Sequence, residues 1–543
     1  MATHVDRRPS WWRHGVIYQI YPRSFQDSDG DGTGDLPGIT SRLDYLRWLG
    51  VDALWLSPIY PSPMHDFGYD VSDYTAVSPE FGTLDDFKVL LHEAHARGIR
   101  VITDLVLNHT SHEHPWFVES ASSRTSEKRS WYLWHDGAPG ARPRPPNNWM
   151  AAFGGSAWEW DPTTRQFFLH SFLKEQPDVN WREPGLQEAM WDVIRFWLDL
   201  GVDGFRLDVV NWFLKDDRLR DNPSRLLGFR AYERQRHLYD RNRPDTIDLM
   251  RRIRATVDAY PDRVTVGEVY TPAPGDPALA ASYYGDGSGL HMAFNFAFLY
   301  SPWRAGAFAR AVDRWEGLLG TDLWPNYTLS NHDQLRAFGR YGRGGHAEAR
   351  ARVAAAMLLT LRGTPFLYYG EEIGMTNGRI PRRRRRDPVG KRYWPFNAGR
   401  DPSRTPMQWD ASRHAGFSTA EPWLPMNRDA AVKHVAAQEA DPGSLLHWYR
   451  ELIGVRQAEW ALRAGSYTRL SAGHGPILSY LRQVGEERVV VHLNFAASDR
   501  DAVMPDGDRW RVLIASAHER GATLPPGRVR LRGYGVIVAR SDP

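Results

Sequence analysis

Short runs of β-branched and aromatic residues alternate with longer amphipathic runs along most of this chain, and this alternation limits its possible folds most strongly. The runs predicted to be strands are VIYQIYPRSF, VDALWLSPI, IRVITDLVLNH, VDGFRLDVV, RVTVGEVY, HMAFNFAF, NYTLSNHD and TPFLYYGEE. Helical runs follow most of them; the one over 83–98 has Thr83 as a cap and ends at Gly98. Eight strands, mostly with a helix behind each, indicate the α/β class and a (β/α)8 TIM barrel, a fold whose size extends beyond about 400 residues with insertions.

The alternation is interrupted once and later ends. Residues 110–179 are rich in Trp, Pro, Gly and Asn and show no sustained helical period, so we expect a domain inserted after the third strand. From residue 466, short strands follow one another without helices, which predicts a carboxyl-terminal antiparallel β-domain. The expected domains are a barrel over 1–109 and 180–465, an inserted domain over 110–179 and a β-domain over 466–543.

The composition argues against several classes of function. Cysteine is absent, so no disulfide and no thiolate metal site can form, and no glycine-rich fingerprint indicates an organic cofactor. The 68 basic residues nearly balance the 65 acidic ones, which gives no indication of nucleic acid or an acidic membrane as a partner. The first residues lack the apolar core of a signal peptide, and no apolar run could span a bilayer. We expect a cytoplasmic protein, either a monomer or a homo-oligomer.

Polar residues stand at the carboxyl ends of several predicted strands, the edge at which a barrel carries its active site. These residues are Asn108, His109, Arg206, Asp208, Glu268, His332 and Asp333. Because side chains alternate along a strand, Arg206 and Asp208 are expected to point into the barrel mouth, and Val209 toward the helices. Three carboxylates from three strands would then meet at one mouth.

The charge pair within GVDGFRLDVV suggests what these carboxylates do. A guanidinium beside Asp208 favours its ionised form, which a nucleophile needs, whereas Glu268 must stay protonated to donate a proton. Two carboxyl groups in different protonation states are typical of glycoside hydrolysis. The alternative is a buried ion pair of Arg206 and Asp208 that serves only the fold, and the other carboxylates on the same rim argue against it.

Seven motifs together resemble those of a known enzyme family. GFRLDVV, GEVY, NHD, DLVLNHTS, DFGYD, QPDVNW and GRDPSRTPMQWD are similar to motifs of the α-amylase superfamily of glycoside hydrolases, most closely its α-glucosidase and oligo-1,6-glucosidase branch. The resemblance covers essentially the whole chain. It implies a (β/α)8 barrel with an inserted domain B and a carboxyl-terminal β-domain, the three parts that the pattern itself predicts.

The resemblance also implies a role for each candidate site residue. Asp208 matches the catalytic nucleophile, Glu268 the general acid/base, and Asp333 the carboxylate that stabilises the distorted transition state. Arg400 is expected to pair with Asp66 and close the pocket behind the terminal glucose, which would make the enzyme exo-acting. The complete set of implied substrate-binding residues is Asp66, Tyr69, His109, Phe153, Phe172, Arg206, His332 and Arg400.

The activity implied is that of a retaining α-glucosidase, which releases α-glucose from the non-reducing end of a small oligosaccharide or glucoside. Val209 and Val179 are typical of a preference for α-1,6 linkages in this branch. Phe67, in contrast, is shared with α-glucosidases of broader substrate choice. A transglucosylase or a disaccharide isomerase of the trehalose or sucrose type would use the same catalytic residues and stays an alternative. A non-enzymatic carbohydrate-binding relative would be expected to lack part of the carboxylate trio.

The acidic segment DSDGDGTGD resembles the front of a calcium loop, although residue 38 is Gly where an EF-hand has Glu. Enzymes of the resembled branch bind one Ca²⁺ or Mg²⁺ in this loop, and we expect a structural ion here. A solvated acidic turn is the alternative. The expected ligands are Asp27, Asp29, Asp31, Asp35 and the backbone carbonyl of Thr33.

The arginine run 382–386, in PRRRRRDP, follows the eighth predicted strand. Because arginine binds phosphate well, the run could recognise a phosphorylated disaccharide. A solvated loop or an oligomer contact is the simpler interpretation, and we favour it.

Overall fold

The computed structural model describes residues 10–140, 142–271, 276–342, 344–471 and 475–542; residues 1–9, on which the signal-peptide expectation partly rests, lie outside these ranges. One sheet has the strand order β10-β11-β1-β2-β3-β7-β8-β9, and its ladders are parallel. The strands are β1 (Ile17–Ile20), β2 (Ala53–Leu56), β3 (Arg100–Leu105), β7 (Gly204–Leu207), β8 (Val264–Gly267), β9 (Met292–Ala293), β10 (Asn326–Thr328) and β11 (Thr364–Tyr368). Each lies within one of the eight predicted runs, in the same order.

The barrel closes between β9 and β10 through a side chain. No backbone ladder joins these two strands among the described residues. Instead, Nδ2 of Asn326 donates a hydrogen bond to the carbonyl of Ala293 (2.7 Å), and its Oδ1 accepts one from the amide of Asn295 (3.3 Å). The predicted (β/α)8 barrel is therefore confirmed, with one seam that strand patterns do not reveal.

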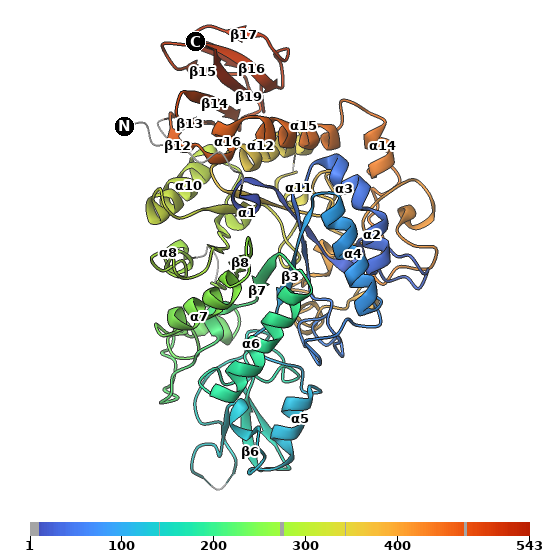
Figure 1. Cartoon of the computed structure of the whole chain (residues 1–543), viewed down its shortest axis with the longest axis vertical. Coiled ribbons are helices and arrows are strands. Elements are labelled where there is room, and N and C mark those ends of the chain that lie inside the picture. Colours follow the sequence, from blue (N-terminus) through green and yellow to red (C-terminus); the bar gives the residue numbers. More distant parts are fainter. Residues whose placement is uncertain (1–9, 141, 272–275, 343, 472–474, 543) are drawn as a thin grey trace.

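Helices cover the outside of the sheet, which is why its strands are buried on both faces (Figure 1). Thr83 forms the predicted cap: its hydroxyl accepts a hydrogen bond from the amide of Asp86 (3.1 Å), whose carboxylate accepts one from the amide of Thr83 (2.8 Å). The longer helices are α3 (Leu43–Leu49), α4 (Leu84–Ala96), α6 (Pro184–Asp199), α7 (Thr246–Asp258), α10 (Ala305–Leu319), α12 (Ala347–Thr360) and α15 (Leu445–Ala458). Shorter ones are α1 (Trp11–His14), α2 (Leu36–Ser41), α8 (Pro277–Ser282), α9 (Ala297–Tyr300), α11 (Ala337–Tyr341), α13 (Pro388–Arg392), α14 (Val435–Glu439) and α16 (Trp460–Ala464).

The segment between β3 and α6 forms a small unit with a sheet of its own. It contains α5 (Pro115–Ser122), which the sequence pattern did not predict, and an antiparallel sheet of order β4-β6-β5. These strands are β4 (Trp134–His135), β5 (Trp158–Asp161) and β6 (Gln166–Leu169). Trp149, Trp158, Phe167 and Leu169 belong to a core cluster of their own. We propose that this unit is the expected inserted domain.

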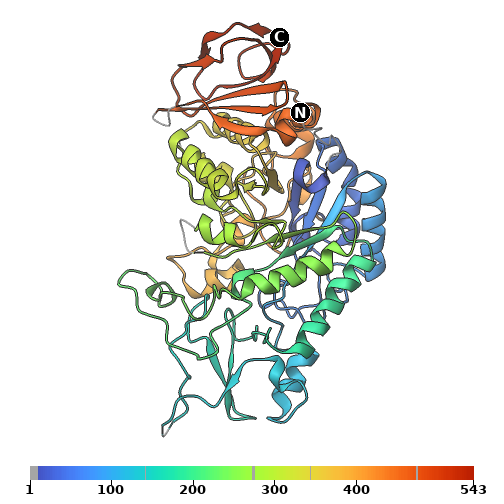
Figure 2. The same cartoon turned by 60° about the vertical axis from the view of Figure 1, so that its left-hand side comes forward.

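The carboxyl-terminal part consists of antiparallel sheets at the opposite end of the molecule from this unit (Figures 1 and 2). A six-stranded sheet has the order β12-β13-β14-β19-β16-β17, and β15 pairs with β18. The strands are β12 (Ser466–Arg469), β13 (Ile477–Val484), β14 (Glu487–Asn494), β15 (Arg500–Met504), β16 (Arg509–Ala515), β17 (Thr523–Leu524), β18 (Gly527–Leu531) and β19 (Val536–Asp542). Within the described ranges, no helix has the length and apolar character needed to cross a bilayer.

Candidate active site

A cavity of about 410 Å³ lies at the carboxyl ends of the barrel strands. Asp208 and Glu268 directly follow β7 and β8, and Asp333 stands in the loop after β10. Of the predicted site residues, those that line the cavity are Asp66, Tyr69, His109, Phe153, Phe172, Asp208, Glu268, Asp333 and Arg400. Arg206 and His332, the other two, lie directly behind this lining: Arg206 contacts Asp208, and His332 contacts Asp333. The structure therefore brings the predicted catalytic and substrate-binding residues together in one place.

The buried guanidinium of Arg206 links the two carboxylates that would react. Its Nη1 donates hydrogen bonds to Asp208 Oδ1 and Asp104 Oδ1, both at 2.7 Å, and its Nη2 donates one to Glu268 Oε2. Asp104 and Arg206 are partners in the β3–β7 ladder. Sequence reasoning missed Asp104, although a carboxylate inside the apolar run VITDLVL was a signal of the same kind as Arg206.

Burial dominates the protonation of the reacting pair. It raises the pKa of Asp208 to about 7, against the opposing effect of Arg206. It also raises the pKa of Glu268 to about 8; Arg206 again opposes the shift, and the charges of Asp208 and Asp333 add to it. The guanidinium favours an ionised Asp208, as predicted, but burial outweighs it. Glu268 nevertheless keeps its proton to higher pH than Asp208, which is the order that an acid and a nucleophile require.

Asp333 is held ionised by several cationic or polar neighbours. Burial alone would raise its pKa, but the charges of Arg400 and Arg404 more than offset this and hold the pKa well below its usual range. Nη2 of Arg404 donates a hydrogen bond to Asp333 Oδ1 at 3.0 Å. Arg404 is fully buried and was not predicted as a site residue, although it stands in the same motif as Arg400.

An ion pair on the cavity wall joins two distant loops. Nη2 of Arg400 donates a hydrogen bond to Asp66 Oδ1, and Nε donates one to Asp387 Oδ1 at 2.5 Å. The guanidinium also lies over the ring of Phe153, 5.1 Å from its centroid. The backbone of Asp66 is fixed by Asp70, whose carboxylate accepts a hydrogen bond from the Asp66 amide at 3.0 Å.

Aromatic rings and His109 form much of the remaining wall, and His332 lies behind it. Phe172 stacks on Trp212 with centroids 4.8 Å apart, and Tyr69 stacks on His332 at 5.5 Å. Burial lowers the pKa of His109 to about 4 and that of His332 to about 3, so both imidazoles are neutral near pH 7. Such a surface offers ring faces and uncharged hydrogen-bonding groups, which suit a neutral polyhydroxylated ring.

Val209 does not point toward the helices, and that prediction is wrong. Strand β7 ends at Leu207, and Val209 has left-handed backbone angles (φ 37°, ψ 48°), so the alternation of a strand no longer applies to it. Its side chain lines the cavity and packs in a cluster with Phe172 and Trp212. A positive φ is a rare conformation for a β-branched residue, and it places this side chain beside the candidate nucleophile.

The acidic loop gathers part of the predicted ligand set. Carboxylate oxygens of Asp27, Asp29 and Asp35 lie within 4.8 Å of one another. Asp31 is outside this cluster, and its Oδ1 accepts a hydrogen bond from the amide of Thr33 at 2.6 Å. Three carboxylates with no nitrogen or sulfur ligand fit a hard cation such as Ca²⁺ or Mg²⁺.

The arginine run does not contact the cavity. None of residues 382–386 is among the described residues that line it. Arg384 pairs with Glu421 at 2.9 Å, and Arg385 donates a hydrogen bond to the carbonyl of Ala398 at 2.6 Å and covers the ring of Trp394. These contacts brace the loops around the run.

Comparisons with known proteins agree along nearly the whole chain. The family described as "Alpha amylase, catalytic domain" matches residues 19–465. A "Probable alpha-glucosidase" of Rhizobium meliloti (strain 1021) is 43% identical over 98% of this chain and 97% of its own length. An oligo-1,6-glucosidase of Parageobacillus thermoglucosidasius is 39% identical over 96% of this chain and 98% of its own.

Two solved structures extend the likeness to the fold. An alpha-glucosyl transfer enzyme is 40% identical with a TM-score of 0.92, over 98% of this chain and 100% of its own. The trehalulose synthase of Pseudomonas mesoacidophila MX-45 is 34% identical with a TM-score of 0.89, over the same shares of both chains.

Proposed function

Because this chain belongs to the α-amylase family of glycoside hydrolases, we propose that it is a retaining, exo-acting α-glucosidase that releases α-glucose from short α-glucosides. The observation that carries the proposal is the shared contact of Arg206 with Asp208 and Glu268 on the wall of one cavity. The family and the glycoside hydrolase activity predicted from the sequence are confirmed by the comparisons. The role of each residue is part of the proposal.

The reaction proceeds in two displacements. Asp208 attacks the anomeric carbon of the terminal glucose while Glu268 gives its proton to the departing glycosidic oxygen, which leaves a β-glucosyl ester on Asp208. Glu268, now ionised, then takes a proton from water as the water oxygen attacks the same carbon, and α-glucose leaves. The shared guanidinium supports this course, because Arg206 donates one hydrogen bond to Asp208 and another to Glu268 and so holds the two carboxyl groups close together. Carboxyl groups so close suit the separation of about 5–5.5 Å in retaining enzymes better than the wider gap of inverting ones.

The exo-acting mode rests on the pair of Asp66 and Arg400. Both residues line the cavity, and Arg400 is braced from its other side by Asp387. A charged wall of this kind can bind the hydroxyls of a terminal sugar and leaves no room for a chain that continues past it. Asp333, held ionised, would accept hydroxyl hydrogens and stabilise positive charge that develops on the sugar ring.

We propose that the acidic loop holds one Ca²⁺ or Mg²⁺ through Asp27, Asp29 and Asp35, with the carbonyl of Thr33 as a further ligand. The loop is tied to a distant segment, because Asp27 Oδ2 accepts a hydrogen bond from the Ser418 hydroxyl at 2.5 Å. An ion there would strengthen this tie, and no step of the reaction passes through it.

Glucosyl transfer or disaccharide isomerisation is the second candidate. The solved relatives include an alpha-glucosyl transfer enzyme and a trehalulose synthase, and both reactions would begin with the same β-glucosyl ester. Hydrolysis and these reactions differ in whether water or a sugar hydroxyl attacks that ester. A phosphorylated substrate is less well supported, because the arginine run does not reach the cavity lining.

Product analysis from maltose, isomaltose, sucrose and trehalose tests the proposal, with Asp208→Asn as the control. We expect free glucose as the main product, with isomaltose among the substrates cleaved, and no product from the variant. A sucrose isomer formed without free glucose would favour the second candidate. If none of the four sugars reacts, the α-glucosidase proposal fails.

A further inference from the structure

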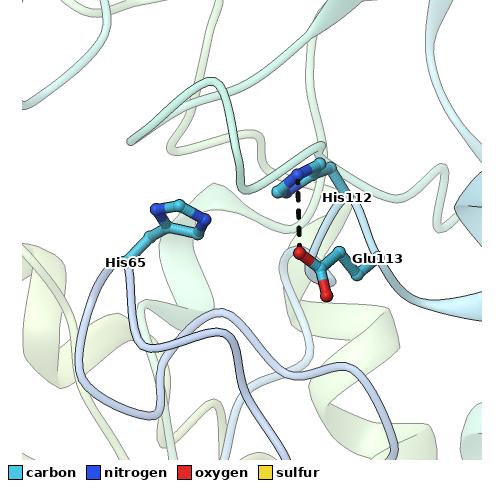
Figure 3. A group of neighbouring side chains, drawn as sticks. All are labelled: His65, His112 and Glu113. Atoms are coloured by element: carbon cyan, nitrogen blue, oxygen red, sulfur yellow. Dashed lines mark ion pairs between the residues drawn. The ribbon is translucent and has the colours of Figure 1, made fainter.

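Three side chains of types that can ligate a metal meet outside the catalytic cavity: His65, His112 and Glu113 (Figure 3). One nitrogen from each imidazole and one oxygen of the carboxylate lie within 4.8 Å of one another. The centroids of the two imidazole rings are 5.5 Å apart, and Nε2 of His112 is 4.0 Å from Oε1 of Glu113. The group is distinct from the acidic loop, whose cluster contains carboxylates only.

The three side chains come from two loops that follow adjacent strands. His65 stands in the loop after β2, directly before Asp66, and His112 and Glu113 stand in the loop after β3. The backbones of both loops are fixed by hydrogen bonds. The amide of His65 donates to Asp70 Oδ2 at 2.8 Å, and the amide of His112 donates to the carbonyl of Glu175 at 2.9 Å. The ligand positions are therefore set by the fold and not by a flexible tail.

These polar groups are poorly satisfied by the protein itself. Within the part of the chain that the structure describes, Nδ1 of His112 is buried and has no hydrogen-bond partner. The contact of His112 with Glu113, at 4.0 Å, is too long for a hydrogen bond. Buried polar atoms nearly always have a partner, so this nitrogen calls for one that the protein does not supply, and the exposed side chains of His65 and Glu113 converge beside it. A cation can satisfy two imidazole nitrogens and a carboxylate at once.

We propose that His65, His112 and Glu113 form a binding site for a transition-metal dication of the Zn²⁺ type. Two imidazoles and one carboxylate are a ligand set that Zn²⁺ accepts, with water at the fourth tetrahedral position. Ca²⁺ and Mg²⁺ prefer oxygen ligands and would not compete well. The side chains of His112 and Glu113 are 38% and 59% exposed, so they can rotate to the distances of about 2.0–2.2 Å that zinc requires.

A metal at this site would link the loop that carries Asp66 to the loop that carries His109. Both of these residues line the catalytic cavity, so the ion would stiffen one of its walls. The proposal does not depend on which reaction the cavity performs.

Titration of the chelator-treated full-length protein with Zn²⁺, followed by calorimetry, tests the site, and Co²⁺ absorption reports its geometry. We expect one Zn²⁺ per chain that Ca²⁺ does not displace, and tetrahedral Co²⁺ bands. His65→Gln and His112→Gln should each weaken this binding at least about tenfold, because each removes one of three protein ligands. His92→Gln, which removes an exposed histidine on α4, and Asp27→Asn, in the acidic loop, should leave it unchanged.

Unchanged Zn²⁺ affinity in both His65→Gln and His112→Gln would overturn the site, as would a loss of equal size in His92→Gln. Loss of binding in Asp27→Asn would instead assign the ion to the acidic loop and also overturn it. Circular dichroism and melting of each variant without metal would show that the fold is intact, so that a loss of binding reports the ligands.

Discussion

Asp66 and Arg400 are 334 positions apart in the sequence and form a buried ion pair on the wall of the catalytic cavity. Asp66 stands in the loop after β2 and Arg400 in the long segment after β11, and the barrel brings these two loops together. Asp387 contacts the same guanidinium from its other side at 2.5 Å. Charges removed from water are tolerated only when each is paired, so the three side chains depend on one another.

Arg400→Ala should therefore reduce both stability and activity. It leaves Asp66 and Asp387 buried without their cation, a change that typically costs about 3–5 kcal/mol of unfolding free energy. Arg400→Lys keeps the charge but cannot contact both carboxylates in the same way. Its stability and activity should therefore lie between those of the unaltered chain and those of Arg400→Ala. Urea denaturation and kcat/KM measure the two effects. Arg195→Ala, which breaks an exposed pair with Asp192 on α6, is the matched control; an equally small change in both variants would contradict the role assigned to the pair.

The pH dependence of kcat/KM follows from the reacting pair. Asp208 must be ionised, and its pKa is raised to about 7, so activity should increase as the pH rises through that value. Glu268 must be protonated, and its pKa is raised to about 8, so activity should decrease above that value. A bell-shaped profile with its optimum between these values is expected, and its two apparent constants belong to the coupled pair.

Glu268→Gln provides the control for this profile. With an aryl α-glucoside, whose leaving group needs little protonation, the variant should keep the acidic limb and lose the alkaline one. An acidic limb near pH 4, where an ordinary Asp titrates, would contradict the burial effect on Asp208.

Val209→Thr should change linkage choice more than overall activity. The side chain lines the cavity next to Asp208, and threonine keeps its shape while replacing one methyl group by a hydroxyl. One group in a substrate pocket typically changes discrimination by about 1–3 kcal/mol, so the ratio of kcat/KM for isomaltose over maltose should fall roughly tenfold. Activity on an aryl α-glucoside, which lacks the second sugar, should change much less. An unaltered ratio would contradict this role of Val209 and would indicate that the aromatic residues of the cavity wall determine which linkage is cleaved.

Ion removal should lower the melting temperature. A cation that binds only the folded protein stabilises it by RT ln(1 + L/Kd), where L is the free cation concentration, so EGTA should lower Tm and added Ca²⁺ should restore it. Asp27→Asn should lose most of this Ca²⁺-dependent part, because its carboxylate belongs to the cluster. Asp85→Asn, at an exposed position on α4, should respond to Ca²⁺ as the unaltered chain does. A Tm that EGTA does not move would indicate a solvated acidic turn.

The barrel could be predicted from the sequence because its buried strands and amphipathic helices have different periods, and each period is visible in short windows. The orientation of Val209 could not, because it depends on where β7 ends. The closure by Asn326 is a contact between distant segments and leaves no local pattern. Helix α5 could not be predicted either, because the many Trp, Pro and Asn residues between 110 and 179 obscured its short helical run.

The site was predicted better than its supporting residues. Motifs identified Asp208, Glu268 and Asp333. Asp104 contacts Arg206 and Arg404 contacts Asp333, and neither received a role although both stand within the quoted motifs. The pKa order of the reacting pair depends on burial, which a sequence does not give residue by residue.

The configuration of the first glucose released tests the central claim most directly. We would follow the anomeric protons by ¹H NMR during the first turnovers on isomaltose or methyl α-glucoside, before mutarotation mixes the anomers. Two displacements through Asp208 predict that α-glucose forms first and the β-anomer only later. β-Glucose as the first product would mean that water attacks directly, and it would contradict Asp208 as the nucleophile.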